Sequence, residues 1–143
     1  MNIRRASPQD APAAAALAWL LWPAHTREEL EEELRGAMDS GAVFLALEGE
    51  EPAGFAECQI RHDYVEGTSG PPVGYLEGIF VAEPFRGQGV ARSLLWACEG
   101  WAAEQGCREF ASDCELTNTA SLRFHLGCGF EEANRIICFT KRL

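Results

Sequence analysis

Apolar and polar positions follow two different periods along this chain, and the changes of period divide it into helices and strands. From 89 to 105 the apolar residues return every three to four positions, which predicts an amphipathic helix. Apolar runs at 42–49 and 51–61 meet at a Gly-Glu-Glu-Pro turn and predict a hairpin. The full pattern predicts strands at 2–5, 42–49, 51–61, 73–81, 108–114, about 130–133 and 135–142, and helices at 8–22, 26–38, 89–105 and 118–128. This order, βααβββαβαββ, indicates an α/β fold built on a mixed sheet.

Capping residues mark two helix starts. Ser7 before Pro8 is typical of an N-cap followed by proline at the first helical position, and Thr26 with Glu29 forms a capping box. The first helix contains AAAALAWLL, which follows MNIRR as the apolar part of a signal peptide would. That run is too short to span a bilayer, so we expect an uncleaved helix in a cytoplasmic protein. The chain has no repeat or linker, and we expect one domain over 1–143.

Composition narrows the class of function. A net charge of −10 argues against a nucleic-acid-binding protein and is compatible with a cationic ligand. The six cysteines form no CxxC pair, and with only three histidines in the chain there is no metal-ligand cluster. We therefore expect no metal, and free thiols in a reducing compartment.

The segment RGQGVARSLL, residues 86–95, places two glycines at the start of the helix at 89–105. Glycine lets successive backbone N–H groups point at one spot, and the helix adds its unpaired N–H groups and its dipole. Such a junction suits a pyrophosphate, with Arg86 and Arg92 adding positive charge. The other interpretation is a turn that only requires positive φ angles. The absence of GxGxxG and of a Walker lysine argues against dinucleotide- and NTP-binding motifs.

Together with NTASLRFHLGCGF, residues 118–130, this junction resembles the two signatures of the GNAT superfamily of acetyltransferases. The first signature is matched by Arg86, Gly89 and Ala91, and the second by Asn118, Gly129 and Phe130. The resemblance implies the GNAT fold, with acetyl-CoA as the acetyl donor and its pantetheine beside the strand at 77–81. The junction residues that it implies for the pyrophosphate are Arg86, Gly87, Gln88, Gly89, Val90, Ala91 and Arg92.

Further strings resemble the aminoglycoside 6′-N-acetyltransferases of the short, chromosomal-type subgroup. They are LWP (21–23), IRHDYVEG (60–67), LEGIFV (76–81), GCRE (106–109), ASD (111–113) and GFEE (129–132). Members of that subgroup acetylate the 6′ amine of kanamycin- and tobramycin-like antibiotics and are commonly homodimers. By matching motif, the resemblance implies contacts to the antibiotic from Trp22, Tyr64, Glu77 and Asp113, and contacts to acetyl-CoA from Ile79, Phe80, Val81 and Asn118.

The chain departs from the family pattern at two positions. His125 stands where the superfamily has a tyrosine, although this subgroup also tends to have histidine there. This histidine either protonates the departing thiolate or packs between helix and sheet, and we favour the positioning role. Asn134 stands where the subgroup has a glutamate, so one carboxylate expected in the antibiotic site is missing.

The same residues also have direct physical interpretations. Glu77 interrupts an apolar strand, where a carboxylate is costly unless it is paired or lies in a cleft, and Gly78 beside it predicts a β-bulge that frees an N–H group. Asp113 follows a strand, either as a ligand-facing acid or as part of an Asx turn. Trp22 is either a core aromatic or a lid over a sugar ring. Tyr64 lies in a Gly- and Pro-containing loop, where ligand contact is more common than core packing.

We expect direct transfer, in which the neutral amine attacks the thioester within a ternary complex. Glu77 is the expected proton acceptor, directly or through water. No base is evident beside Cys114 or Cys138, which argues against an acyl-enzyme, and we expect His25 and His62 to be surface residues. Two other functions stay open: acetylation of another amine, such as a polyamine or a protein N-terminus, and acetyl-CoA binding without turnover.

Overall fold

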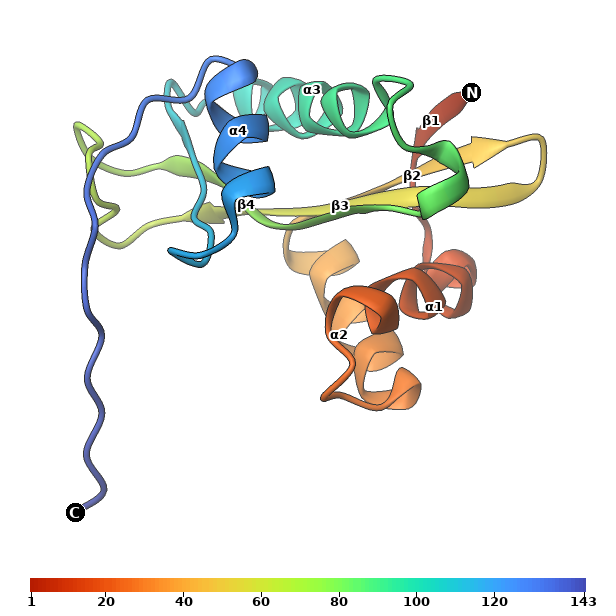
Figure 1. Ribbon diagram of the computed structural model, residues 1–143, viewed down its shortest axis with the longest axis horizontal. Helices are drawn as coiled ribbons and strands as arrows, with labels where there is room; N and C mark the ends of the chain where they lie inside the picture. The colour runs from red at the N-terminus through yellow and green to blue at the C-terminus, as the bar shows by residue number, and fades with distance from the viewer.

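In this computed structural model, residues 1–143 fold around a five-stranded sheet with helices on both faces (Figure 1). In order across the sheet, the strands are β1 (Asn2–Arg5), β2 (Ala42–Glu48), β3 (Glu51–Arg61), β4 (Val73–Val81) and β5 (Phe110–Ala111). The strands β1 to β4 are antiparallel to their neighbours, whereas β5 runs parallel to β4. The mixed sheet and the α/β class that the sequence predicts are confirmed.

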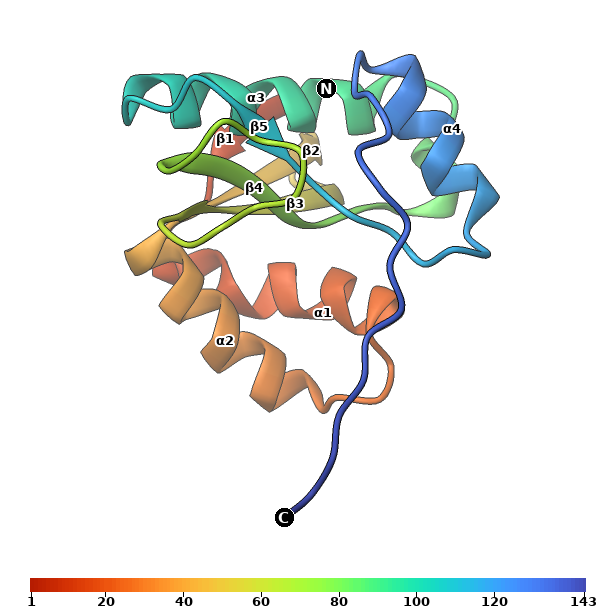
Figure 2. The ribbon, with the colours of Figure 1, turned by 90° about the vertical axis from the view of Figure 1, so that its left-hand side faces the viewer.

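The helices form a layer on each side of the sheet. On one face lie α1 (Ala11–Leu21) and α2 (Arg27–Ser40), and on the other lie α3 (Val90–Glu104) and α4 (Thr119–Gly127), as Figures 1 and 2 show. Single 3-10 turns precede α1 at Pro8–Asp10 and follow β4 at Glu83–Phe85. None of these helices combines the length and the apolar character that crossing a bilayer requires.

The helix starts follow the predicted capping chemistry in part, since only the Thr26 half of the capping box forms and the Glu29 carboxylate pairs with His25. The Thr26 hydroxyl accepts a hydrogen bond from the Glu29 N–H at 3.1 Å. Before α1, the carboxylate of Asp10 accepts a hydrogen bond from the Ser7 N–H at 2.8 Å and pairs with Arg4 at 2.8 Å. The hydrogen bond from Arg4 is the largest cause that lowers the pKa of Asp10. This pairing joins β1 to the start of α1.

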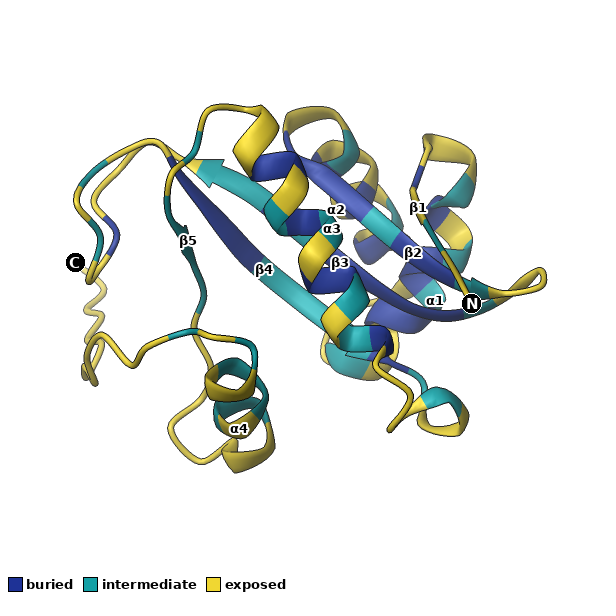
Figure 3. Ribbon diagram, turned by 90° about the horizontal axis from the view of Figure 1, so that it is seen from above, coloured by how far each residue is buried: buried dark blue, intermediate teal, exposed yellow.

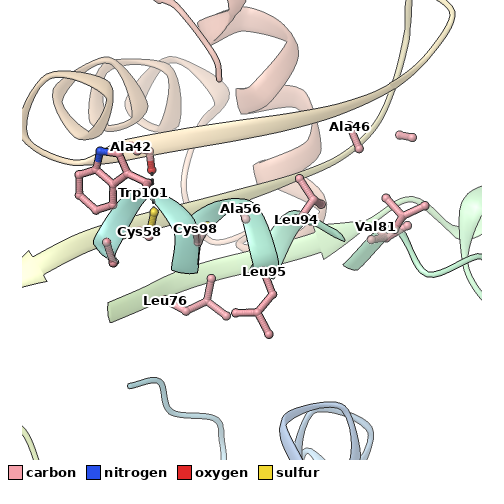
Figure 4. Close-up of a cluster of buried hydrophobic side chains, with 13 residues drawn as sticks. Ala42, Ala46, Ala56, Cys58, Leu76, Val81, Leu94, Leu95, Cys98 and Trp101 are labelled. Atoms are coloured by element: carbon pink, nitrogen blue, oxygen red, sulfur yellow. Dashed lines mark hydrogen bonds between the residues drawn. The ribbon is translucent and has the colours of Figure 1, made fainter. Parts of the chain in front are cut away.

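An apolar layer packs between the sheet and the helices on each of its two faces. In the first, Leu94, Leu95 and Cys98 of α3 pack against β2, β3 and β4 (Figure 4). In the second, Leu30 and Phe55 belong to a cluster that α1 and α2 form on the opposite face. The buried positions follow the middle strands and the inner side of α3 (Figure 3). The helical period that the sequence predicts over 89–105 is therefore confirmed.

The structure contradicts the two strands predicted at about 130–133 and 135–142. From Glu131 to Leu143 the chain forms no strand, and it runs away from the rest of the fold in Figures 1 and 2. A strand needs a neighbour for its N–H and C=O groups, and no strand of this chain pairs with the segment. The strand predicted at 108–114 is likewise shortened to Phe110–Ala111, because β5 leaves β4 after two paired residues.

Candidate active site

The outer edge of β4 is free over most of its length. β5 pairs with this edge only at Gly74 and Tyr75, and the two strands then diverge (Figure 3). Residues 77–80 are half-buried as a result. Ile79 packs against the α3 layer and Phe80 against the α1–α2 layer, so the side chains are fixed while the backbone edge stays open. An unpaired strand edge offers a row of N–H and C=O groups to an extended ligand, and the resemblance to the GNAT superfamily implies the pantetheine here.

A β-bulge interrupts β4, as Gly78 predicts. Across the ladder, Glu57 of β3 is the partner of Gly78, whereas the next residue, Cys58, is the partner of Leu76. Glu77 is therefore the extra residue of the bulge. The bulge turns the carboxylate of Glu77 out of the regular alternation of the strand, at the place where the outer edge of β4 is free.

Trp22 lies against the bulge. It follows the last residue of α1, and its ring is so close to Gly78 that a Cβ there would lie 2.5 Å from a ring carbon. The ring also meets Phe55 edge-on, with 6.0 Å between the ring centroids. Trp22 is half-buried and lines a cavity with the rest of its surface. Its packing against the core is established, and its contact with a ligand stays a prediction.

The glycine junction forms a cavity of about 240 Å³ at the N-terminus of α3. Gly87 and Gly89 have φ angles of +77° and +78°, and a side chain at either position would point into open space. Gly89 is the N-cap of α3, where no side chain accepts a hydrogen bond from the first turn. Gln88 is exposed and does not line the cavity. The lining residues are Val81, Phe85, Arg86, Gly87, Gly89, Val90, Ala91, Arg92 and Phe124.

Backbone carbonyl groups hold the two arginines of this junction. Arg86 donates through Nε to the carbonyl of Val81 at 2.8 Å, and its guanidinium lies 5.5 Å from the ring centroid of Phe80. Arg92 donates through Nη2 to the carbonyl of Gly127 at 3.1 Å. The arginines therefore tie the junction to β4 and α4. Both also line the cavity, so their charge favours an anion beside the unpaired N–H groups.

A second cavity, of about 290 Å³, collects carboxylates beside Trp22. Its lining residues are Trp22, His25, Glu33, Glu57, Gln59 and Glu77. His25 is exposed, as predicted, and its Nδ1 lies 3.3 Å from the carboxylate of Glu29. Acids from α2, β3 and β4 thus face one space, which suits a ligand with several ammonium groups.

Glu57 is the carboxylate of this cavity that is most perturbed. It is half-buried, and no hydrogen bond from another residue of the protein stabilises its charged form. Burial, followed by repulsion from Glu77 and Glu33, raises the pKa of Glu57 to about 7. Both causes disfavour the charged form of the side chain.

Glu77, in contrast, belongs to a continuous polar network. Arg61 donates to its two oxygens at 2.8, 3.0 and 3.1 Å. The same guanidinium lies 3.7 Å from the ring centroid of Tyr75, whose hydroxyl donates to the carboxylate of Asp113. Burial, and then this hydrogen bond, raises the pKa of Tyr75, so the phenol remains a donor. The network links the bulge of β4 to the residues after β5.

Tyr64 and Asn134 lie together but do not line the carboxylate cavity. The hydroxyl of Tyr64 donates to Glu66 at 2.9 Å, and the side-chain amide of Asn134 donates to the other oxygen of Glu66 at 2.8 Å. Tyr64 is 79% exposed. The structure therefore brings Trp22 and Glu77 into one cavity and joins Tyr64 and Asn134 in a separate pair.

His125, on α4, is held by Ser121 of its own helix and by Ser112, the residue after β5. Its Nδ1 lies 2.7 Å from the carbonyl oxygen of Ser121, so Nδ1 carries the proton. In the neutral ring, Nε2 then accepts a hydrogen bond from the Ser112 hydroxyl at 2.8 Å. Asn118 caps α4 by accepting from the Ser121 N–H at 3.1 Å. This geometry supports a positioning role for His125, which stays a prediction.

Neither cysteine considered as an acyl carrier has an activating partner. Cys114 and Cys138 are exposed, and no base forms a hydrogen bond with either thiol. All six cysteines are free thiols. No group of three or more His, Cys, Asp or Glu side chains is arranged to hold a metal ion.

Sequence analysis missed four residues of the site. Glu57, Arg61, Tyr75 and Ser112 all form or extend the polar arrangement around the bulge. Glu57 had a signal, because it is an acid in the apolar run at 51–61, as Glu77 is in its own strand. The other three depend on partners that only the fold brings close.

Comparison with known proteins identifies the family. Residues 12–130 match the model of the Acetyltransferase (GNAT) family. The chain belongs to this family. Aminoglycoside N(6′)-acetyltransferase type 1 of Stenotrophomonas maltophilia is 46% identical over 140 residues, which cover 96% of this chain and 91% of that protein. The protein of the same name from Salmonella enteritidis is 41% identical over 146 residues, covering 99% of each chain.

Solved structures of aminoglycoside acetyltransferases have the same fold as this chain. AAC(6′)-Iy in complex with the bisubstrate analog CoA-S-monomethyl-acetylneamine has a TM-score of 0.92 and 41% identity, with 99% of this chain and 98% of that chain covered. Apo AAC(6′)-IG from Acinetobacter haemolyticus has a TM-score of 0.93 and 34% identity, with 100% and 99% covered. The GNAT fold is therefore confirmed, and the chain is an acetyl-CoA-dependent N-acetyltransferase.

The glycine junction can be tested with Gly89→Val. We expect acetyl-CoA binding to weaken by at least about tenfold, because the valine side chain projects into the open space before α3 and resists the positive φ. Calorimetric titration with coenzyme A measures the Kd. The matched control is Gly49→Val, since Gly49 has a φ of +62° and equally open space but lies in the β2–β3 turn. Unchanged affinity in folded Gly89→Val would contradict the assignment.

The environment of Glu57 predicts a pH-dependent gain in stability for Glu57→Gln. Because folding raises the pKa of Glu57 from 4.5 to about 7, its ionised form destabilises the fold. This cost is absent below pH 4.5 and complete above about pH 7. We expect the variant to gain roughly 2–3 kcal/mol in free energy of unfolding at pH 8 and almost nothing at pH 4.

Urea unfolding at the two pH values measures this difference. Glu51→Gln is the control, because Glu51 is an exposed acid on the same strand. Equal stability of Glu57→Gln and the wild type at pH 8 would show that the carboxylate is well solvated or paired.

Proposed function

We propose that this chain is an aminoglycoside 6′-N-acetyltransferase, which transfers the acetyl group of acetyl-CoA to the 6′ amine of the antibiotic. The observation that carries the proposal is the cavity lined by Glu33, Glu57 and Glu77 beside the free edge of β4. A ligand with several ammonium groups complements this charge. The names of relatives that are 35–46% identical support the same substrate class.

In this proposal the donor lies along the free edge of β4. The pyrophosphate binds at the glycine junction, residues 87–92, where N–H groups and two arginines meet. The pantetheine extends past Val81 and Ile79 along the unpaired edge, and Asn118 contacts it from the start of α4. Val81 lies four residues along β4 from the bulge at Glu77, a distance of about 13 Å. The thioester therefore reaches the bulge, where the carboxylate cavity begins.

The acceptor binds on the acidic side of the bulge. Glu77 lines the cavity, and Asp113 lies beyond its lining, joined to Glu77 through Tyr75 and Arg61. Both acids hold ammonium groups through charge-assisted hydrogen bonds, each of ~1.5–3 kcal/mol. Trp22 packs against a sugar ring. Tyr64 and Asn134 contact a more distant part of the antibiotic, since neither lines the cavity. Asn134 makes this contact through an uncharged amide group.

Transfer is direct in this proposal. The neutral amine attacks the carbonyl carbon of the thioester, and the coenzyme A thiolate departs without an acyl-enzyme. Backbone N–H groups at the free edge of β4 stabilise the negative charge that develops on the carbonyl oxygen. His125 contributes by fixing the Ser112 hydroxyl between α4 and β5.

We also place the reaction in the cytoplasm. All six cysteines are free thiols, the state that a reducing compartment maintains. Cys107 and Cys128 are only half-buried, so burial does not protect every thiol from oxidation.

A coenzyme A release assay tests the proposed function. Neomycin and paromomycin form a matched pair, because they differ in carrying an amine or a hydroxyl at the 6′ position. We expect turnover with neomycin, kanamycin and tobramycin and none at the 6′ position with paromomycin. Faster turnover of spermidine or of a peptide N-terminus would favour another amine. Coenzyme A binding without turnover of any amine would indicate a binding module.

We further propose that the protein is a homodimer in which the C-terminal segment binds a second copy. Ile136, Ile137 and Phe139 are 69%, 80% and 88% exposed, and residues 136–143 form no hydrogen bond or ion pair with their own chain. The last nine residues include three basic and no acidic side chains, whereas the whole chain has a net charge of −10. An apolar, basic segment therefore complements the acidic body of another copy.

Sedimentation equilibrium of the double variant Ile137→Asp, Phe139→Asp tests this proposal. We expect the wild type to sediment as a dimer and the variant as a monomer with unchanged circular dichroism. Leu20→Asp is the control, since Leu20 is 57% exposed on α1, away from the segment. A monomeric wild type, or a variant that remains dimeric, would overturn the role of the segment.

A further inference from the structure

The environment of Glu57 favours the binding of a cationic ligand. Its position in β3 is directly across the bulge from Gly78, and it lies two residues from Phe55, whose side chain packs under α1 and α2. The alternation of the strand therefore turns Glu57 toward the same helices. The side chain lines the cavity beside Trp22 and is half-buried, and no hydrogen bond from the protein stabilises its charge. An ionised carboxylate in such a place is costly until a positive ligand arrives.

No charged group around Glu57 forms an ion pair with its carboxylate. Glu77 on β4 and Glu33 on α2 face it with the same charge. Arg61, at the end of β3, donates to both oxygens of Glu77. His25, at the rim of the cavity, pairs with Glu29 outside it. Among the cavity carboxylates, Glu57 thus combines partial burial, two like-charged neighbours and the absence of a cation.

We propose that Glu57 accepts the proton of the reacting ammonium group and is a catalytic residue of the acetyl transfer. This inference rests on the proposed function, because it requires an amine that arrives protonated. One proton moves from nitrogen to the Glu57 carboxylate, and the freed lone pair forms the C–N bond to the thioester carbon. The C–S bond breaks, a second proton passes from nitrogen to the departing sulfur, and Glu57 releases its proton to water.

The geometry separates this role from that of Glu77, which the sequence predicts as the proton acceptor. Arg61 donates three charge-assisted hydrogen bonds to the oxygens of Glu77, and protonation of Glu77 would weaken them. Glu57 has no such hydrogen bonds to lose. A carboxyl with a pKa of about 7 also suits proton transfer near neutral pH. In this division, Glu77 binds an ammonium group and Glu57 removes the proton.

The dependence of kcat on pH tests the proposal. For the wild type with neomycin, kcat should rise with pH and level off above about pH 7, since Glu57 acts in its ionised form. Glu57→Gln, which keeps the side-chain volume, should lower the plateau by about a hundredfold and remove the rise. Glu33→Gln removes a like-charged neighbour, so it should move the rise to lower pH without abolishing it. A residue with a structural role alone would produce neither change in the profile.

Wild-type turnover separates the two proposals. If the wild type acetylates no 6′ amine, the proposed function and this inference both fail. If it does, but Glu57→Gln retains the wild-type plateau and rise, the proposed function stands and Glu57 is not the proton acceptor. Should Glu57→Gln not fold, Glu57→Asp replaces it, because it keeps the acid but withdraws it by one methylene. A lowered plateau with the rise retained supports the proposal, and an unchanged plateau overturns it.

Discussion

The parting of β4 from β5 after Tyr75 determines the arrangement of the rest of the site. A strand in the interior of a sheet has both edges paired, and such a strand cannot offer its backbone to a ligand. Here the inner edge of β4 stays paired with β3 from Val73 to Val81, which keeps the strand rigid. The outer edge is left open, and α3 begins with uncapped N–H groups at the glycine junction beyond it. One strand therefore connects the proposed pyrophosphate site to the carboxylate cavity.

The bulge within β4 brings charged and aromatic side chains to this free edge. It inserts Glu77 between the paired positions, and Gly78 leaves room for the ring of Trp22. Arg61 pairs with Glu77, whereas no cationic side chain of the protein stabilises Glu57. Burial and two like-charged neighbours raise the pKa of Glu57, which suits it to remove a proton, while Glu77, paired with Arg61, is placed to bind a cation in the same cavity.

Much of this was predictable from local signals in the sequence. The glycine junction and the bulge at Gly78 follow from backbone chemistry that a few adjacent residues encode. The ion pair of Arg61 with Glu77 was not predictable from the sequence, because it depends on the register between β3 and β4, which the bulge shifts. The strands predicted after Phe130 failed for a similar reason. Their apolar pattern is genuine, but a strand forms only when its backbone pairs with a neighbouring edge, and residues 131–143 pair with none of the strands.

Hydrogen exchange of the backbone amides, with and without coenzyme A, tests the central role of the free edge of β4 most directly. Binding along that edge should slow exchange in peptides that cover residues 77–92 and leave the hairpin at 42–61 unchanged, because β2 and β3 are already paired there. Slower exchange confined to other segments, under conditions where calorimetry shows that coenzyme A is bound, would contradict the placement of the donor on β4.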